Sequence, residues 1–147
     1  MKKYYKYIIA VIILLIALLL VNSHLDVSGG EIEGVKEITS KSTATVEKRD
    51  LSRGSSLEYE LNEEQIERLK GLILETDFRI DLSNKVFFDD NDHYWISINS
   101  NNQKSWLGIR SLGGEYISVF NQFNDKHLKI KNPNWKESLE EILSLTK

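Results

Sequence analysis

Cysteine is absent from all 147 residues of the chain, and proline occurs only once. Without cysteine the chain can form no disulfide, carry no cysteine-linked lipid and use no cysteine nucleophile. No internal repeat is visible in the sequence. An exported domain built from this chain must therefore fold by burying an apolar core alone.

Acidic residues are missing from the first 21 positions, although three of the 19 basic residues lie there. The remainder carries 16 basic and 22 acidic residues, a formal charge of −6. This negative charge argues against nucleic acid as a partner, because nucleic-acid binding depends on basic surfaces. It also argues against adhesion to anionic membranes or wall polymers through bulk charge.

Residues 7–21 read YIIAVIILLIALLLV, an uncharged and almost wholly apolar run. A helix with no polar side chains suits the core of a bilayer. Lys2, Lys3 and Lys6 precede the run and, by the positive-inside rule, stay in the cytoplasm. The sequence predicts a cytoplasmic basic tail at 1–6, a transmembrane anchor in contact with lipid at 7–21, a flexible tether at 22–30 and an extracytoplasmic domain at 31–147.

The same run can also be the core of a signal peptide. Val21 and Ser23 are small enough for cleavage after Ser23, which would release the domain. The apolar core is longer than the usual 7 to 15 residues of a signal peptide, which favours a single-pass anchor. In both cases the residues beyond about Asn22 lie outside the cytoplasm.

The domain is predicted to be α+β, with a mostly antiparallel sheet, one helix inserted midway and one helix at the C-terminus. Two-residue alternation of apolar and polar side chains predicts the strands. They fall at residues 43–48, 57–61, 78–82, 86–88, 94–98, 106–110, 116–120 and 128–130, with a weaker pattern at 31–37.

Two capping boxes mark where the helices begin. Asn62 with Gln65 three residues later predicts the first helix, which should end near Glu75 or Thr76. Asn134 with Glu137, directly after Pro133, predicts the second. Each helix has one apolar face, and the first should pack against another part of the domain through it.

Assuming two-residue or symmetric turns, the three strands between residues 93 and 120 separate into two faces. One face is assigned to the core: Tyr94, Ile96, Ile98, Leu107, Ile109, Tyr116 and Phe120. The other carries His93, Trp95, Trp106, Arg110, Ile117 and Val119, with Gly108 sheltered under Trp95. A solvated face should be polar, and this one is not. Either a helix or a partner must therefore cover it.

If a partner covers the second face, the binding residues are Trp95, Trp106, Arg110 and His93. Trp and Arg are enriched at recognition hot spots, since flat aromatic area is buried at low entropic cost and guanidinium pairs with carboxylates. Two Trp side chains can also stack on sugar rings. We expect a protein partner before a glycan.

An acidic loop, Asp89 to His93, is the alternative site. Three carboxylates and an imidazole within five residues can hold a cation, but the spacing fails the calcium-loop pattern. No nucleophile elbow, zinc motif or phosphate loop occurs. The sequence predicts no enzyme, no cofactor and no metal site. It predicts a membrane-anchored binding or regulatory module that acts on another cell-envelope protein; the alternative is an envelope ligand-binding protein or hydrolase.

Overall fold

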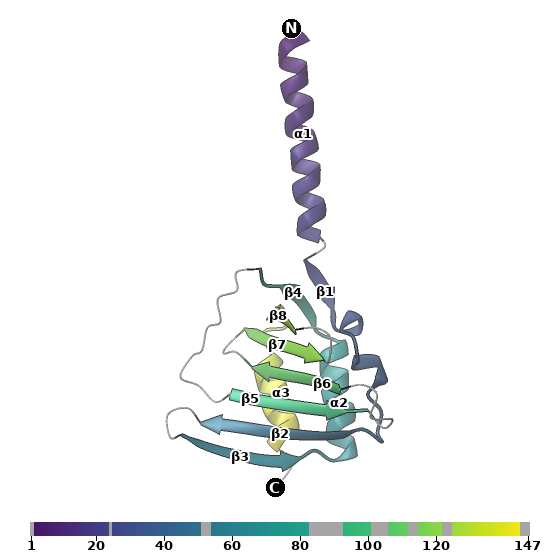
Figure 1. Ribbon diagram of the computed structural model, residues 1–147, viewed down its shortest axis with the longest axis vertical. Helices are drawn as coiled ribbons and strands as arrows, with labels where there is room; N and C mark the ends of the chain where they lie inside the picture. Colours follow the sequence, from purple (N-terminus) through teal and green to yellow (C-terminus); the bar gives the residue numbers. More distant parts are fainter. Residues whose placement is uncertain are drawn as a thin grey trace.

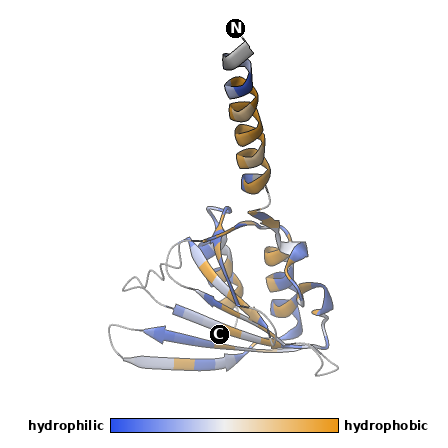
Figure 2. Ribbon diagram, turned by 45° about the horizontal axis from the view of Figure 1, so that its top comes forward, coloured by the Kyte–Doolittle hydropathy of each residue, from blue (hydrophilic) through white to orange (hydrophobic). Residues whose placement is uncertain are grey.

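The computed structural model describes residues 2–23, 25–50, 54–82, 93–100, 106–111, 115–121 and 125–144. Helix α1 (Lys2–Ser23) projects from the domain and is apolar along most of its length (Figures 1 and 2). Its segment Tyr4–Asn22 is long and apolar enough to cross a membrane, and none of it is buried against the domain. The predicted apolar N-terminal helix is therefore present.

The segment after α1 belongs to the fold and not to a flexible tether. Strand β1 (Asp26–Ser28) pairs with β4 (Asp77–Ile80), and the Ile80 amide donates to the Leu25 carbonyl at 2.7 Å. Gly29 begins the short helix η1 (Gly29–Glu31) and is buried. A Cβ at Gly29 would lie 1.6 Å from the Ile73 carbonyl oxygen, so only glycine fits there. The predicted tether at 22–30 is thus wrong over residues 26–30, because a three-residue strand is too short to show alternation.

The weakly strand-like pattern at 31–37 is not a strand either. It contains the end of η1 and a second short helix, η2 (Val35–Glu37). Gly34 caps η2 with φ of 91°, a left-handed conformation that favours glycine. Val35 is fully buried, so this segment contributes to the core in spite of its irregular backbone.

The described strands form one antiparallel sheet in the order β1-β4-β8-β7-β6-β5-β2-β3 (Figure 1). This confirms the α+β prediction, with its mostly antiparallel sheet and two domain helices. The predicted strand at 86–88 lies outside the described residues. The remaining strands are β2 (Thr43–Asp50), β3 (Ser55–Glu60), β5 (His93–Asn99), β6 (Trp106–Ser111), β7 (Tyr116–Asn121) and β8 (Asp125–Ile130).

Helix α2 (Glu63–Leu74) begins with the predicted capping box. The Asn62 side chain accepts from the Gln65 amide at 2.9 Å, and Gln65 Oε1 accepts from the Asn62 amide at 3.0 Å. The helix ends at Leu74 with Glu75 as its C-cap, close to the predicted end. Its apolar stripe is buried: Ile66, Leu69, Leu72 and Ile73.

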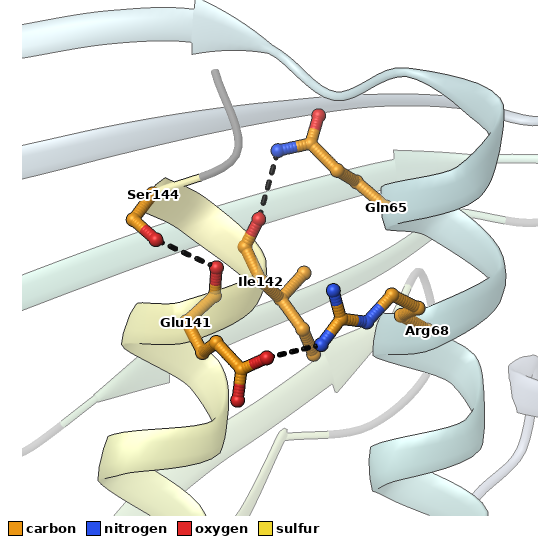
Figure 3. Close-up of polar contacts among 5 residues, drawn as sticks. All are labelled: Gln65, Arg68, Glu141, Ile142 and Ser144. Carbon is orange, nitrogen blue, oxygen red and sulfur yellow. Dashed lines mark hydrogen bonds and ion pairs between the residues drawn. The ribbon is translucent and has the colours of Figure 1, made fainter. Parts of the chain in front are cut away.

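Helix α3 (Trp135–Ser144) lies beside α2, and Figure 3 shows the polar contacts between them. The Gln65 side chain donates to the Ile142 carbonyl at 2.8 Å, and Arg68 pairs with Glu141 at 2.8 Å. Gln65 is completely buried, so one side chain both caps α2 and joins α3 to it.

Both domain helices lie on the same face of the sheet (Figure 1). Their buried side chains join those of β2, β5, β6 and β7 in one apolar core, and the Trp135 ring meets Phe78 edge-on at 5.7 Å. The sequence left open whether a helix covers the second face. Neither α2 nor α3 covers it.

Candidate functional site

Strands β5 and β6 place the predicted binding residues on the uncovered face. Trp95 lies opposite Arg110, and Ile96 lies opposite Ile109. This register differs by two positions from the predicted one, in which Trp95 faced Gly108. A shift of two positions leaves every side chain on the same face. Trp95, Trp106 and Arg110 therefore share the uncovered face, as predicted.

Strand β7 is shifted by one residue, which exchanges its faces. Gly108 lies opposite Phe120 and Arg110 opposite Ser118. Ile117 and Val119, predicted for the second face, are core residues with 1% and 6% exposure. Tyr116 and Phe120, predicted for the core, lie on the uncovered face instead. The prediction failed because it assumed a two-residue turn, whereas an odd number of residues separates Ser111 from Ile117.

An aromatic cluster of Trp95, Trp106, Phe120 and Arg110 occupies the centre of this face. The Phe120 ring meets Trp95 at 5.8 Å and 81°, and Trp106 at 5.1 Å and 60°. The Arg110 guanidinium carbon lies 4.3 Å from the Trp95 ring centroid and 5.8 Å from that of Phe120. The four side chains are half-buried, because they cover one another while neither α2 nor α3 covers them.

Phe120 is the member that sequence reasoning missed. Its ring, and not that of Trp95, lies over Gly108, where a Cβ would come within 2.3 Å. Gly108 therefore provides the space in which rings from β5 and β7 meet across β6. The signal was available in the sequence, since a glycine inside a strand indicates close approach by a neighbour.

Arg49 approaches Trp95 from the β2 side, with its guanidinium carbon 5.4 Å from the ring centroid. Two hydrogen bonds of 2.8 and 2.9 Å join Arg49 to Glu47. These bonds lower the pKa of the Glu47 carboxyl and raise the pKa of Arg49. Arg49 is thus already neutralised by an acidic neighbour.

Arg110 differs from Arg49 in having no acidic partner among the described residues. Within the ranges that the structure describes, no carboxylate lies at ion-pair distance from its guanidinium, which contacts only aromatic rings. A stacked guanidinium retains its in-plane donors for a further ligand. The cluster therefore combines an apolar platform with one cation that can pair with an anion.

His93, the fourth predicted binding residue, is buried at the start of β5. Only 7% of the residue is exposed, and its Nδ1 lies 3.0 Å from the Ser111 carbonyl oxygen. Because a carbonyl oxygen only accepts, Nδ1 donates this bond. The structure thus brings together Trp95, Trp106 and Arg110, whereas His93 is buried and bonds to the Ser111 carbonyl.

Of the alternative acidic site, Asp89 to His93, the structure describes only His93. Asp89, Asp90 and Asp92 lie outside the described residues, so the predicted loop is not described as a unit. Among the residues that are described, no group of three His, Asp or Glu side chains is arranged to hold a metal ion.

A shallow hollow of about 250 Å³ adjoins the cluster on the β2 side. Trp95 and Ser97 contribute from β5, and the hollow is otherwise lined by Thr45, Glu47, Arg49 and Glu58. Pockets that enclose small molecules usually measure about 300 to 1,000 Å³ and bury most of the ligand. This open hollow lies below that range, so the face resembles a contact surface more than an enclosing pocket.

Comparison with protein families, curated proteins and solved structures finds no match for this chain.

Proposed function

We propose that this protein is a membrane-anchored, non-catalytic binding or regulatory module whose open sheet face contacts another cell-envelope protein. One observation carries the proposal: the cluster of Trp95, Trp106, Phe120 and Arg110 lies on the one face of the sheet that neither domain helix covers. Most antiparallel sheets with one free face present polar side chains there.

The composition of the cluster supports a protein partner. Trp and Arg are the side chains most enriched at interface hot spots, where a desolvated centre is ringed by polar groups. Here the aromatic centre has polar and charged neighbours on both sides, such as Glu47 and Arg49 on β2 and Ser118 on β7. Arg110 adds a cation without an acidic partner in the described part of the chain, which suits a carboxylate on the partner.

Helix α1 supports the membrane part of the proposal. Its 19-residue span is apolar and exposed, so in water it would present a continuous apolar surface. With Lys2, Lys3 and Lys6 in the cytoplasm, the domain stands outside the membrane. The Arg79 side chain donates to the Asn22 side chain, which joins the end of α1 to β4. The face is then held near partners in the same membrane, where tethering raises the effective concentration.

The hollow beside Trp95 favours a second candidate, an envelope glycan. A sugar ring can stack on an aromatic face while Glu47 and Arg49 bond its hydroxyls, and the hollow has both elements. Its small and open shape gives this candidate second place.

Site-specific photocrosslinking in intact cells tests the proposal. A photoreactive residue replaces Ser97, which lines the hollow beside Trp95, and a matched control replaces Glu140, an exposed residue of α3 on the other side of the sheet. We expect a protein adduct from position 97 only, and its loss when Trp95→Ala and Trp106→Ala are added. Equal adducts at both positions, or an adduct that survives the double substitution, would contradict the proposed face. A carbohydrate adduct would support the glycan instead.

A further inference from the structure

Strand β3 forms an edge of the sheet, and its hydrogen-bonding register is fixed. Among the described strands it pairs only with β2, in a register that places Leu57 opposite Lys48. The Leu61 amide donates to the Ala44 carbonyl at 2.9 Å in the same register. Hydrogen-bonded pairs alternate along an antiparallel ladder, so Leu57 and Tyr59 also bond to β2. The N–H and C=O groups of Ser56, Glu58 and Glu60 therefore point outward.

This edge lacks most of the features that protect edge strands from pairing. Strand β3 contains no proline and no lysine, and it extends over six residues. Leu57 is 63% exposed on the helix side of the sheet. The outward backbone groups and the apolar side chain together form a template for an added strand.

The charges on β3 define what such a strand must carry. The side chains of Glu58 and Glu60 lie on the open face, and Glu58 stands directly opposite Glu47. Arg49 neutralises Glu47, whereas Glu58 and Glu60 form no ion pair within the described ranges. Opposite charges on neighbouring strands stabilise pairing, and like charges oppose it.

We propose that the β3 edge binds an extended segment of another protein by β-strand addition, and that this segment alternates basic with apolar side chains. The basic side chains lie beside Glu58 and Glu60 on the open face. The apolar ones lie beside Leu57 and Tyr59 on the other face. This site is separate from the aromatic cluster and adds a second contact surface.

A second copy of this chain is the wrong occupant. Strands β1 and β3 lie at opposite edges of the sheet, and α1 joins the domain at the β1 edge (Figure 1). Any twofold axis that pairs β3 with β3 reverses the direction from β1 to β3 in the second copy. The two α1 helices would therefore point in opposite directions. Given the anchoring proposed above, both helices cannot then enter one membrane. Seven strand spacings of about 4.8 Å also place β3 about 34 Å from β1, away from the bilayer.

The test measures binding of a fluorescent peptide, in which Lys alternates with Val, to the full chain in lipid nanodiscs by anisotropy. Glu58→Pro removes one outward N–H and leaves the pairing with β2 intact, since proline is tolerated on the free side of an edge. Losing one main-chain bond and adding a clash should weaken binding at least about tenfold. Glu58→Thr retains the N–H and loses one charge, so it should weaken binding only about threefold. This weakening should be smaller in high salt, because salt screens the charge.

Two matched controls separate strand addition from charge attraction. A peptide with alternate backbone amides methylated keeps its charge but cannot pair with an edge, and it should not bind. A peptide with Glu in place of Lys should also fail. Trp95→Ala with Trp106→Ala should bind the lysine peptide as the unsubstituted chain does, which keeps this test independent of the aromatic cluster.

The proposal is overturned if the unsubstituted chain does not bind the lysine peptide, or if the methylated peptide binds equally well. It is also overturned if Glu58→Pro binds as tightly as Glu58→Thr. Near-ultraviolet circular dichroism confirms that the proline variant is folded. Ser56→Pro, at the next outward position along β3, provides a second variant with the same expected loss of at least about tenfold.

Discussion

The ring of Phe120 fills the space above Gly108 that a side chain at position 108 would need, with Cε2 only 2.3 Å from an added Cβ. This single contact links three strands, because Trp95 and Trp106 both pack against the same ring. The aromatic cluster therefore depends on a residue that has no side chain.

Gly108→Ala should displace Phe120 and loosen the cluster. Overpacking of this kind costs about 1 to 3 kcal/mol of unfolding free energy. Urea denaturation gives this value, and a red shift of tryptophan fluorescence should accompany it, since Trp95 and Trp106 become more hydrated. An unchanged urea midpoint together with an unchanged spectrum would show that the ring moves aside at no cost.

Gly71→Ala provides the opposite expectation. Gly71 lies inside α2, and nothing stands within 4 Å of a Cβ at this position. Alanine favours a helix interior over glycine by about 1 kcal/mol, so this variant should raise the urea midpoint. A decrease in stability would mean that the added methyl group is not free of neighbours.

Substitutions at Gln65 should show how much its side-chain hydrogen bonds with the Asn62 amide and the Ile142 carbonyl contribute to stability. Gln65→Met fills the volume but leaves the Asn62 amide and the buried Ile142 carbonyl without partners, at a cost of about 2 kcal/mol. Gln65→Glu places a buried carboxylate against the Ile142 carbonyl and should cost more. Arg68→Met, which breaks only the exposed pair with Glu141, should cost under about 1 kcal/mol. Equal costs for Gln65→Met and Arg68→Met in chemical denaturation would refute this assignment.

Arg110→Gln should weaken partner capture while leaving the domain folded. An exposed cation–π contact contributes about 0.5 to 1 kcal/mol, so the urea midpoint should fall only slightly. A hydrogen bond to a charged group is worth about 1.5 to 3 kcal/mol, so the yield of the Ser97 crosslink should fall about tenfold or more. A full crosslink yield would show that Arg110 does not face the partner.

Asp26 should make stability depend on pH at the β1 edge. The hydrogen bond from Lys131 lowers the pKa of Asp26 from its ordinary value of 3.8, with added attraction from Arg79. Because the pKa is lower in the folded state, ionised Asp26 stabilises the fold at pH values above its unfolded-state pKa. This stabilisation is lost as the pH falls through the folded-state pKa. Asp26→Asn should therefore be slightly less stable than the unsubstituted protein at about pH 7, and the difference should shrink as the pH falls below the ordinary pKa of 3.8. Urea midpoints measured across this pH range test it, and a constant difference would contradict the linkage.

Local signals in the sequence predicted the parts of the fold that depend on neighbouring residues. The capping box of Asn62 and Gln65 involves residues three apart, and it formed as predicted. Strand alternation located β2, β5, β6 and β7 because each has buried side chains on one face, and it located β3 although only Tyr59 of that strand is partly buried. A second capping box, of Asn134 and Glu137, was predicted at the start of α3. There the Asn134 amide donates to the side chain of Asn132, two residues earlier.

Register and helix placement could not be predicted in the same way. The position of Phe120 over Gly108 depends on the number of residues in the β6–β7 connection. One residue more or fewer moves every β7 side chain to the opposite face of the sheet. The side of the sheet that α3 occupies depends on contacts such as Trp135 with Phe78, which are 57 positions apart and leave no periodic signal. The aromatic cluster was therefore predicted in part, with Trp95, Trp106 and Arg110 but without Phe120.

The position of β8 in the sheet determines when the domain can fold. Strand β8 lies between β4 and β7, so β1 and β4 reach the rest of the sheet only through it. During synthesis, residues 26–28 and 77–80 must wait for residues 125–130 before they gain their neighbour on the sheet side. A nascent chain that stops before β8 therefore leaves α1 attached to an unfinished sheet, and the sheet is completed only after residues 125–130 have been made.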